Sequence, residues 1–118
     1  MLGVILGIAA LVAFVTVVVK LTLFLMSWLT NKVKEKLRNR NTQKVAVGDL
    51  NEIIKNCDNE VALDELENLV DEKGATHIIA DVDYSGNVVD VEAIDAEKVE
   101  RRVYDTINKT GEGLVLIS

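Results

Sequence analysis

The sequence predicts a single-pass transmembrane helix followed by a small α+β domain in which helices pack on one face of a mostly antiparallel sheet. Three observations predict this arrangement. Lys20 is the only charged side chain between residues 2 and 29, a basic segment follows, and the remaining residues alternate between helical and strand-like patterns. We therefore divide the chain into a transmembrane helix (1–30), a basic juxtamembrane segment (31–44) and an acidic α+β domain (45–118).

The first element is an apolar stretch whose length predicts that it spans a membrane. Residues 2–19 are uncharged and would form a helix about 27 Å long, close to the thickness of the hydrocarbon core. Continuation to Leu29 gives length to spare. A cleaved signal peptide is the competing interpretation. It is disfavoured because no basic region precedes the run and no small-residue cleavage site follows it.

Two faces of this stretch predict association between membrane helices. Gly3 and Gly7 have the spacing that lets helix backbones approach closely, and Ala10 lies on the same face. The second face is small to polar and includes Thr16, Lys20 and Ser27. Lys20 lies either at the membrane interface or inside the membrane beside a polar partner, and the sequence leaves both placements open.

The basic segment sets the predicted orientation. We expect its basic side chains to attract anionic lipid headgroups; they are Lys32, Lys34, Lys36, Arg38 and Arg40. No basic side chain precedes the apolar stretch. The positive-inside rule therefore predicts an external amino terminus and a cytoplasmic carboxy-terminal domain.

The net charge of −6 conceals an asymmetry between the two parts of the chain. Residues 1–44 carry seven basic side chains and one acidic side chain, giving +6, whereas residues 45–118 carry six basic and eighteen acidic side chains, giving −12. Phosphate neutralisation supplies most of the affinity of proteins for nucleic acid. The acidic domain is therefore a poor candidate for nucleic-acid binding.

The first half of the domain shows one short strand pattern and two helical patterns. Residues 43–47 alternate polar and apolar side chains, as a strand does. Asp49 then precedes a helical pattern in capping-box spacing, with Cys57 as a small hydrophobe on its inner face. A second helix is predicted from Glu60 to Lys73, ended by Gly74.

The second half predicts a hairpin, a helix and a final strand. Residues 76–84 and 88–94 are rich in Ile and Val and surround a Ser-Gly-Asn turn. His77 alternates with the apolar set of the first strand and is expected on its opposite face. A helix follows over residues 96–110, with Asp95 as its cap. Residues 113–118 are a short apolar run, predicted to pair with the hairpin.

The hairpin also carries the spacing of an EF-hand calcium loop. The candidate ligands are Asp81, Asp83, Ser85 and Glu92, with Gly86 at the position of the sharp turn. Carboxylates in this spacing supply the hard oxygen ligands that calcium prefers. A plain acidic hairpin is the competing interpretation, because a β-branched run enters the loop where an EF-hand has a helix.

No set of side chains suggests enzymatic roles. The chain has one His and one Cys, no glycine-rich phosphate loop and no nucleophile paired with a base. We expect no catalytic residue and no cofactor other than calcium.

The expected function is a membrane-anchored binding or regulatory module, or a subunit of a membrane assembly, that presents its acidic domain to a protein partner. Two alternatives remain: a pore- or lesion-forming homo-oligomer built from the membrane helix, and a calcium-responsive module. The expected partners are membrane lipid and a protein, which could be a second copy of the chain.

Overall fold

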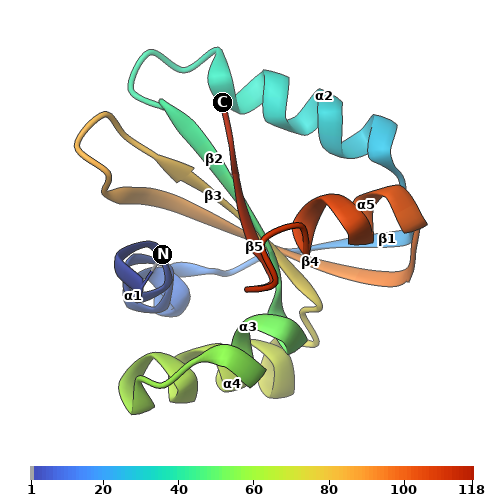
Figure 1. Ribbon diagram of the computed structural model, residues 1–118. Helices are drawn as coiled ribbons and strands as arrows, with labels where there is room; N and C mark the ends of the chain where they lie inside the picture. Colours follow the sequence, from blue (N-terminus) through green and yellow to red (C-terminus); the bar gives the residue numbers. More distant parts are fainter. Residues whose placement is uncertain (1) are drawn as a thin grey trace.

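The computed structural model describes residues 2–118 and shows a five-stranded mixed sheet between two layers of helices (Figure 1). The elements are α1 (Leu2–Leu11), the 3-10 helix η1 (Val12–Phe14), β1 (Val18–Phe24), α2 (Met26–Leu37), β2 (Lys44–Asp49), α3 (Leu50–Asn56), α4 (Glu60–Lys73), β3 (His77–Val82), β4 (Val88–Val99), α5 (Arg101–Ile107) and β5 (Leu114–Ile117). The strand order is β1-β4-β3-β2-β5. β1 runs parallel to β4, and the other neighbours are antiparallel.

Helices cover both faces of the sheet. In Figure 1, α2 and α5 lie above it, and α1, α3 and α4 lie below it. Val45 and Val47 of β2 pack in the core beneath α2 and α5, whereas Ala46 packs in the core beside α1, α3 and α4. All six residues of the central strand β3 are buried. The predicted arrangement, with helices on one face only, is therefore wrong.

The apolar stretch folds as several short elements. α1 ends at Leu11 after ten residues, a length of about 15 Å, and β1 begins at Val18. Within residues 2–118, no helix has both the length and the hydrophobicity needed to cross a membrane. The predicted membrane-spanning helix is therefore wrong, and so is the single-pass topology with an external amino terminus and a cytoplasmic domain.

The side chains of the second half of this stretch explain why it does not continue as a helix. Residues 15–19 are all β-branched, and such side chains lose rotamer freedom in a helix but fit a pleated strand. The sheet also provides a partner, because Val18–Phe24 pairs along residues 93–99 of β4. The apolar stretch therefore supplies both the helix α1, which covers one face of the sheet, and the strand β1 at its edge.

The same pairing changes the end of the hairpin. A helix was predicted from residue 96, but β4 continues to Val99 because β1 pairs with it there. α5 starts at Arg101, after Glu100, whose Oε1 accepts a hydrogen bond from Met26 N at 3.3 Å. β5 pairs with β2 at the far edge of the sheet, not with the hairpin strands as predicted.

Several local signals are confirmed. The Asp49 side chain caps α3 by accepting from the backbone N–H groups of Asn51 and Glu52. Gly74 ends α4 in the left-handed conformation, with φ of 70°. The predicted hairpin forms, with Gly86 in its turn at φ of 82°.

Candidate protein-binding surface

α1 is apolar on all sides, yet only part of it packs against the rest of the molecule. Ile8 and Ala9 are its buried residues. Large apolar side chains remain exposed on this segment and beside it: Leu2 (54%), Leu6 (39%), Phe14 (76%), Val61 (74%) and Val89 (51%). We call these five residues the α1 surface. Contiguous exposed apolar side chains mark interaction sites in folded proteins more often than scattered ones do.

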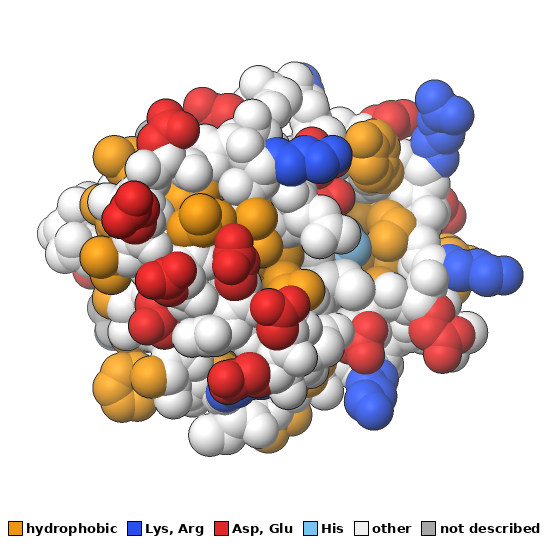
Figure 2. Space-filling view, turned by 90° about the horizontal axis from the view of Figure 1, so that it is seen from below, with side chains coloured by type: hydrophobic (Ala, Val, Ile, Leu, Met, Phe, Trp, Pro, Cys, Tyr) orange, Lys and Arg blue, Asp and Glu red, His pale blue; other side chains and the backbone are white. Residues whose placement is uncertain are grey.

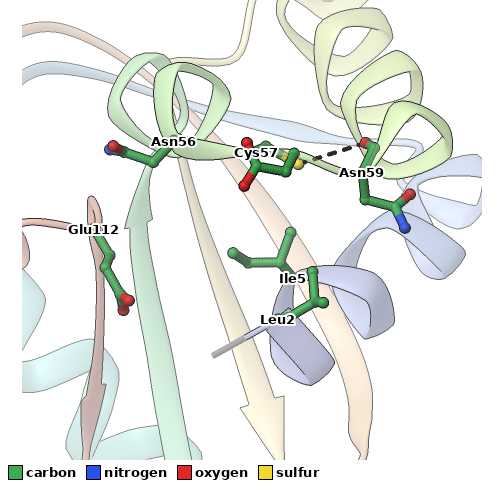
Figure 3. A pocket seen from close by; sticks show the side chains of 7 residues that line it. Leu2, Ile5, Asn56, Cys57, Asn59 and Glu112 are labelled. Carbon is green, nitrogen blue, oxygen red and sulfur yellow. Dashed lines mark hydrogen bonds between the residues drawn. The ribbon is translucent and has the colours of Figure 1, made fainter.

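Three hollows beside α1 make this surface concave in places. The largest, of about 490 Å³, lies between the start of α1 and the loop from α3 to α4. Figure 3 shows Leu2 and Ile5 on one side of it, and Asn56, Cys57 and Asn59 on the other. A second hollow of about 270 Å³ separates α1 from α4. A third, of about 300 Å³, lies between the end of α1 and β4.

Carboxylates surround these apolar side chains. Asp58 and Glu112 line the first hollow, Glu65 the second and Asp90 the third. Figure 2, which views the molecule from the side of α3 and α4, shows acidic side chains gathered around exposed apolar ones. Asp90 Oδ2, however, lies 3.9 Å from Lys36 Nζ, and Lys73 Nζ donates to Val15 O beside Phe14. The α1 surface is therefore negative around the first two hollows, where Asp58, Glu65 and Glu112 lie.

The residues predicted for membrane helix association lie on different elements. Gly3, Gly7 and Ala10 belong to α1, Thr16 precedes β1, Lys20 lies within β1 and Ser27 within α2. A Cβ atom on Gly7 would come within 2.8 Å of the Val88 side chain. The close approach that this glycine permits is therefore one between α1 and β4 of the same chain. The predicted polar stripe does not exist, because it required one continuous helix.

A buried ion cluster joins α2 to the sheet. Lys36 is 9% and Asp81 7% exposed, and Lys36 Nζ lies 2.9 Å from Asp81 Oδ1 and 3.5 Å from Glu92 Oε1. Lys32 Nζ lies 3.2 Å from Glu92 Oε2. Thr42 Oγ1 donates to Asp81 Oδ2 at 3.0 Å, while Oδ1 faces Lys36 Nζ.

Lys36 remains a cation in this setting. Burial alone would lower the pKa of its amine, but the hydrogen bond and charge of Asp81, with the charges of Glu92 and Asp90, outweigh burial and raise that pKa above 10.5. The contact between the Lys36 ammonium and Asp81 joins the last turn of α2 to β3.

This ion cluster includes two of the residues predicted as calcium ligands. Asp81 and Glu92, predicted as calcium ligands, face lysines. Asp83 Oδ1 instead accepts from the backbone N–H groups of Ser85 and Asn87 at 2.9 Å each, as in an ordinary turn. No group of three or more His, Cys, Asp or Glu side chains within residues 2–118 is placed to hold a metal ion.

The basic residues predicted to meet lipid headgroups fall into two groups. Lys32 and Lys36 form the ion pairs described above, whereas Lys34, Arg38 and Arg40 are exposed. The sequence did contain a signal for Lys36, because it follows Leu29 and Val33 at helical spacing on the buried side of α2. The basic residues around Lys36 led to its assignment to the lipid-binding group instead.

His77 is buried. Its alternation with the apolar residues of its own strand predicted that it lies on the opposite face of that strand. It does lie on that opposite face, but α2 and α5 cover that face too. The ring packs edge-on against Phe24, with centroids 5.2 Å apart, and Nδ1 lies 2.7 Å from Thr76 Oγ1. Burial lowers the pKa of His77 below 6.5, opposed by the charge of Asp49.

Acidification is therefore expected to destabilise the fold partly through His77. Because the folded-state pKa is depressed, the unfolded chain binds this proton more readily. The stabilisation from a neutral ring is complete above about pH 6.5 and is lost as the pH falls toward the folded-state pKa. Urea unfolding at about pH 7.5 and pH 5.5 should show a smaller loss of stability for His77→Gln than for the unmodified chain. Equal losses would contradict this assignment.

Comparisons with protein-family models, curated proteins and solved structures find no match to this chain.

Proposed function

We propose that the chain is a non-enzymatic binding module that uses the α1 surface to hold a protein partner. The contact region of that partner is apolar at its centre and basic at its border. The observation that carries this proposal is the exposure of Phe14 and its apolar neighbours beside three hollows. Large side chains exposed next to hollows favour a partner that inserts its own side chains into them.

The charge around the surface supports a basic partner. Asp58, Glu65 and Glu112 border the first two hollows, and residues 45–118 carry −12 in total. Opposite charges across an interface accelerate encounter and exclude partners of the wrong sign. An anionic lipid surface would meet repulsion at this border, which makes a protein the better match.

The other functions expected from the sequence have less support. The pore-forming alternative depends on a helix that crosses a membrane, and residues 2–118 contain none. The calcium alternative depends on Asp81 and Glu92, whose carboxylates lie within ion-pair distance of Lys36. The α1 surface gives no support to the pore-forming or the calcium-responsive function.

A synthetic amphipathic helix with leucines on one side and lysines on the other is expected to bind the chain. Replacing Phe14 by Ser should weaken binding at least about 10-fold, or about 1.4 kcal/mol, because burying such a side chain contributes about 1.5–3 kcal/mol. Added salt should also weaken binding. Calorimetry gives the affinity, and amide chemical shifts give the residues in contact.

The matched control is Tyr104→Ser. Tyr104 is 49% exposed but lies on α5, in the opposite helical layer, so its replacement should leave affinity unchanged. A peptide with glutamine in place of lysine should bind more weakly. The proposal fails if Phe14→Ser binds as tightly as the unmodified chain, if the glutamine peptide binds equally well, or if anionic phospholipid vesicles bind more tightly than the lysine peptide.

A further inference from the structure

The two edges of the sheet differ in how well they are protected against the addition of another strand. β1 ends the sheet on one side and β5 on the other. An edge strand presents unpaired N–H and C=O groups that can accept a further strand, and lysine side chains on the edge discourage this. β1 carries the exposed Lys20 near its middle, whereas β5, with the sequence Leu-Val-Leu-Ile, has no polar side chain. β5 is therefore the less protected edge.

The hydrogen bonds show which backbone groups of β5 point away from the sheet. Gly113 O accepts from Asp49 N at 2.8 Å, and these two residues continue the register of β5 with β2. Because backbone groups alternate in direction along a strand, Val115 and Ile117 also direct theirs to β2. Leu116 therefore points its N–H and C=O outward. Within residues 2–118, neither of these two groups has a hydrogen-bond partner.

A hollow beside this edge offers the side-chain contacts that so short a strand lacks. Thr110 Oγ1 already donates to Leu114 O at 3.2 Å, so few backbone groups remain open. The hollow, of about 220 Å³, lies between α2 and the end of β5, which Figure 1 shows beside each other. We call it the α2 groove. Its apolar lining is Met26, Leu29, Val33, Leu37 and Ile117.

The α2 groove lies on the side of the sheet where an added strand would use it. Ile117 packs on the face covered by α2 and α5, whereas Leu116 packs on the face covered by α1, α3 and α4. The side chains of an added strand alternate between the same two faces. Every second side chain of an extended segment that pairs with Leu116 therefore faces the α2 groove.

The basic side chains of α2 predict the charge of such a segment. Lys32 and Lys36 pair with carboxylates of the sheet. Lys34 instead lines the α2 groove, Arg38 follows one helical turn later, and both are exposed. No carboxylate within residues 2–118 lies at ion-pair distance from Lys34 or Arg38. Two unpaired cations beside an apolar hollow favour an acidic partner and disfavour a basic one.

We propose that β5 and the α2 groove bind an extended acidic segment of a partner protein by strand addition. The segment pairs with the backbone of Leu116, its apolar side chains fill the α2 groove, and its carboxylates meet Lys34 and Arg38. An open strand edge matches a polypeptide backbone, which a lipid or a nucleic acid lacks. This site lies in the helical layer opposite the α1 surface, so failure of either proposal leaves the other standing.

Synthetic peptides test the mode of binding. A peptide in which valine alternates with threonine, with glutamates at both ends, should bind the chain in calorimetry and slow amide hydrogen exchange at Leu116. A peptide with lysine in place of glutamate should bind at least about 10-fold more weakly. Methylating the backbone nitrogens of either the threonines or the valines should abolish binding for one set only, because alternate N–H groups face β5. Loss of binding for both sets or for neither would overturn strand addition.

Variants of the chain test the site. Leu116→Pro removes an outward N–H without removing a bond to β2, and proline is tolerated in that position of an edge strand. It should abolish binding of the glutamate peptide without changing the circular dichroism spectrum. Lys34→Glu should weaken binding at least about 10-fold, because like charges then meet. Lys98→Glu is the matched control, since it makes the same charge change at an exposed residue of β4 and should leave affinity unchanged.

Three results would overturn the proposal. The first is a folded Leu116→Pro variant that still binds the glutamate peptide. The second is equal affinity of Lys34→Glu and Lys98→Glu, which decides the matter even if the proline variant does not fold. The third is a dimer of the unmodified chain in sedimentation equilibrium that the glutamate peptide does not dissociate but Leu116→Pro does, because this edge would then belong to a second copy.

Discussion

Replacing Asp81 with alanine is expected to lower the free energy of unfolding by about 3 kcal/mol. Removing one partner of a buried ion pair costs about 3–5 kcal/mol because the other charge stays buried. The lower end applies because Glu92 Oε1 remains 3.5 Å from Lys36 Nζ. Thr42 Oγ1 also loses its acceptor. Urea unfolding followed by circular dichroism measures the change.

Two further variants separate the pair from a general effect of charge. Lys36→Met combined with Asp81→Leu removes both charges and should recover most of the loss, since replacing a buried pair with apolar side chains is often neutral. Asp105→Ala breaks the exposed pair with Arg101 and should cost no more than about 0.5 kcal/mol. If Asp81→Ala costs no more than Asp105→Ala, the cluster does not hold α2 to the sheet.

Gly113→Ala is expected to destabilise the fold by about 2–5 kcal/mol. Gly113 has φ of 76°, where a side chain costs about 1–2 kcal/mol. A Cβ atom there would lie 2.5 Å from Glu52 Cβ and 2.9 Å from Ile53 N. Displacing α3 to make room adds about 1–3 kcal/mol. Thermal or urea unfolding provides the measurement.

Gly86→Ala is the matched control. Gly86 has a similar φ of 82°, but a Cβ atom would meet nothing within 4 Å. Its replacement should therefore cost only the backbone contribution of about 1–2 kcal/mol. The difference between the two variants isolates the close approach of Gly113 to α3. Equal losses would mean that α3 gives way easily or lies farther from Gly113 in solution.

The parts of the fold that were predictable from sequence are those with local signals. Asp49 caps a helix and Gly74 ends one because each satisfies backbone groups a few residues away. The hairpin turn is local in the same sense, since Asp83 and Gly86 shape it without help from distant residues. Such signals act within a few residues and do not depend on the rest of the chain.

The amino-terminal third was not predictable in this way because its partners are distant in sequence. Val18–Phe24 forms a strand with residues 93–99 of β4, and hydropathy alone does not distinguish an apolar strand and helix from one membrane helix. The run of β-branched side chains over residues 15–19 was the signal that favoured a strand. The length of β4 and the position of β1 follow from the same long-range pairing.

The candidate site was largely unpredictable. Exposure of Leu2 and Leu6 depends on which side of α1 packs inward, and α1 is apolar all round, so its pattern gives no direction. The ion cluster requires α2 to lie over β3 and β4, which sequence spacing does not reveal. Only the acidic border was foreseeable, because the negative charge is concentrated in residues 45–118.

The pairing of β1 with β4 also determines the order in which the molecule is completed during synthesis. β1 leaves the ribosome early, but Val18 must wait for its partner Ala93, which is encoded 75 residues later. At about 5–20 residues per second, the most apolar part of the chain stays uncovered for several seconds. β1 therefore pairs with β4 only after most of the chain has been made, and long-range pairings of this kind form slowly.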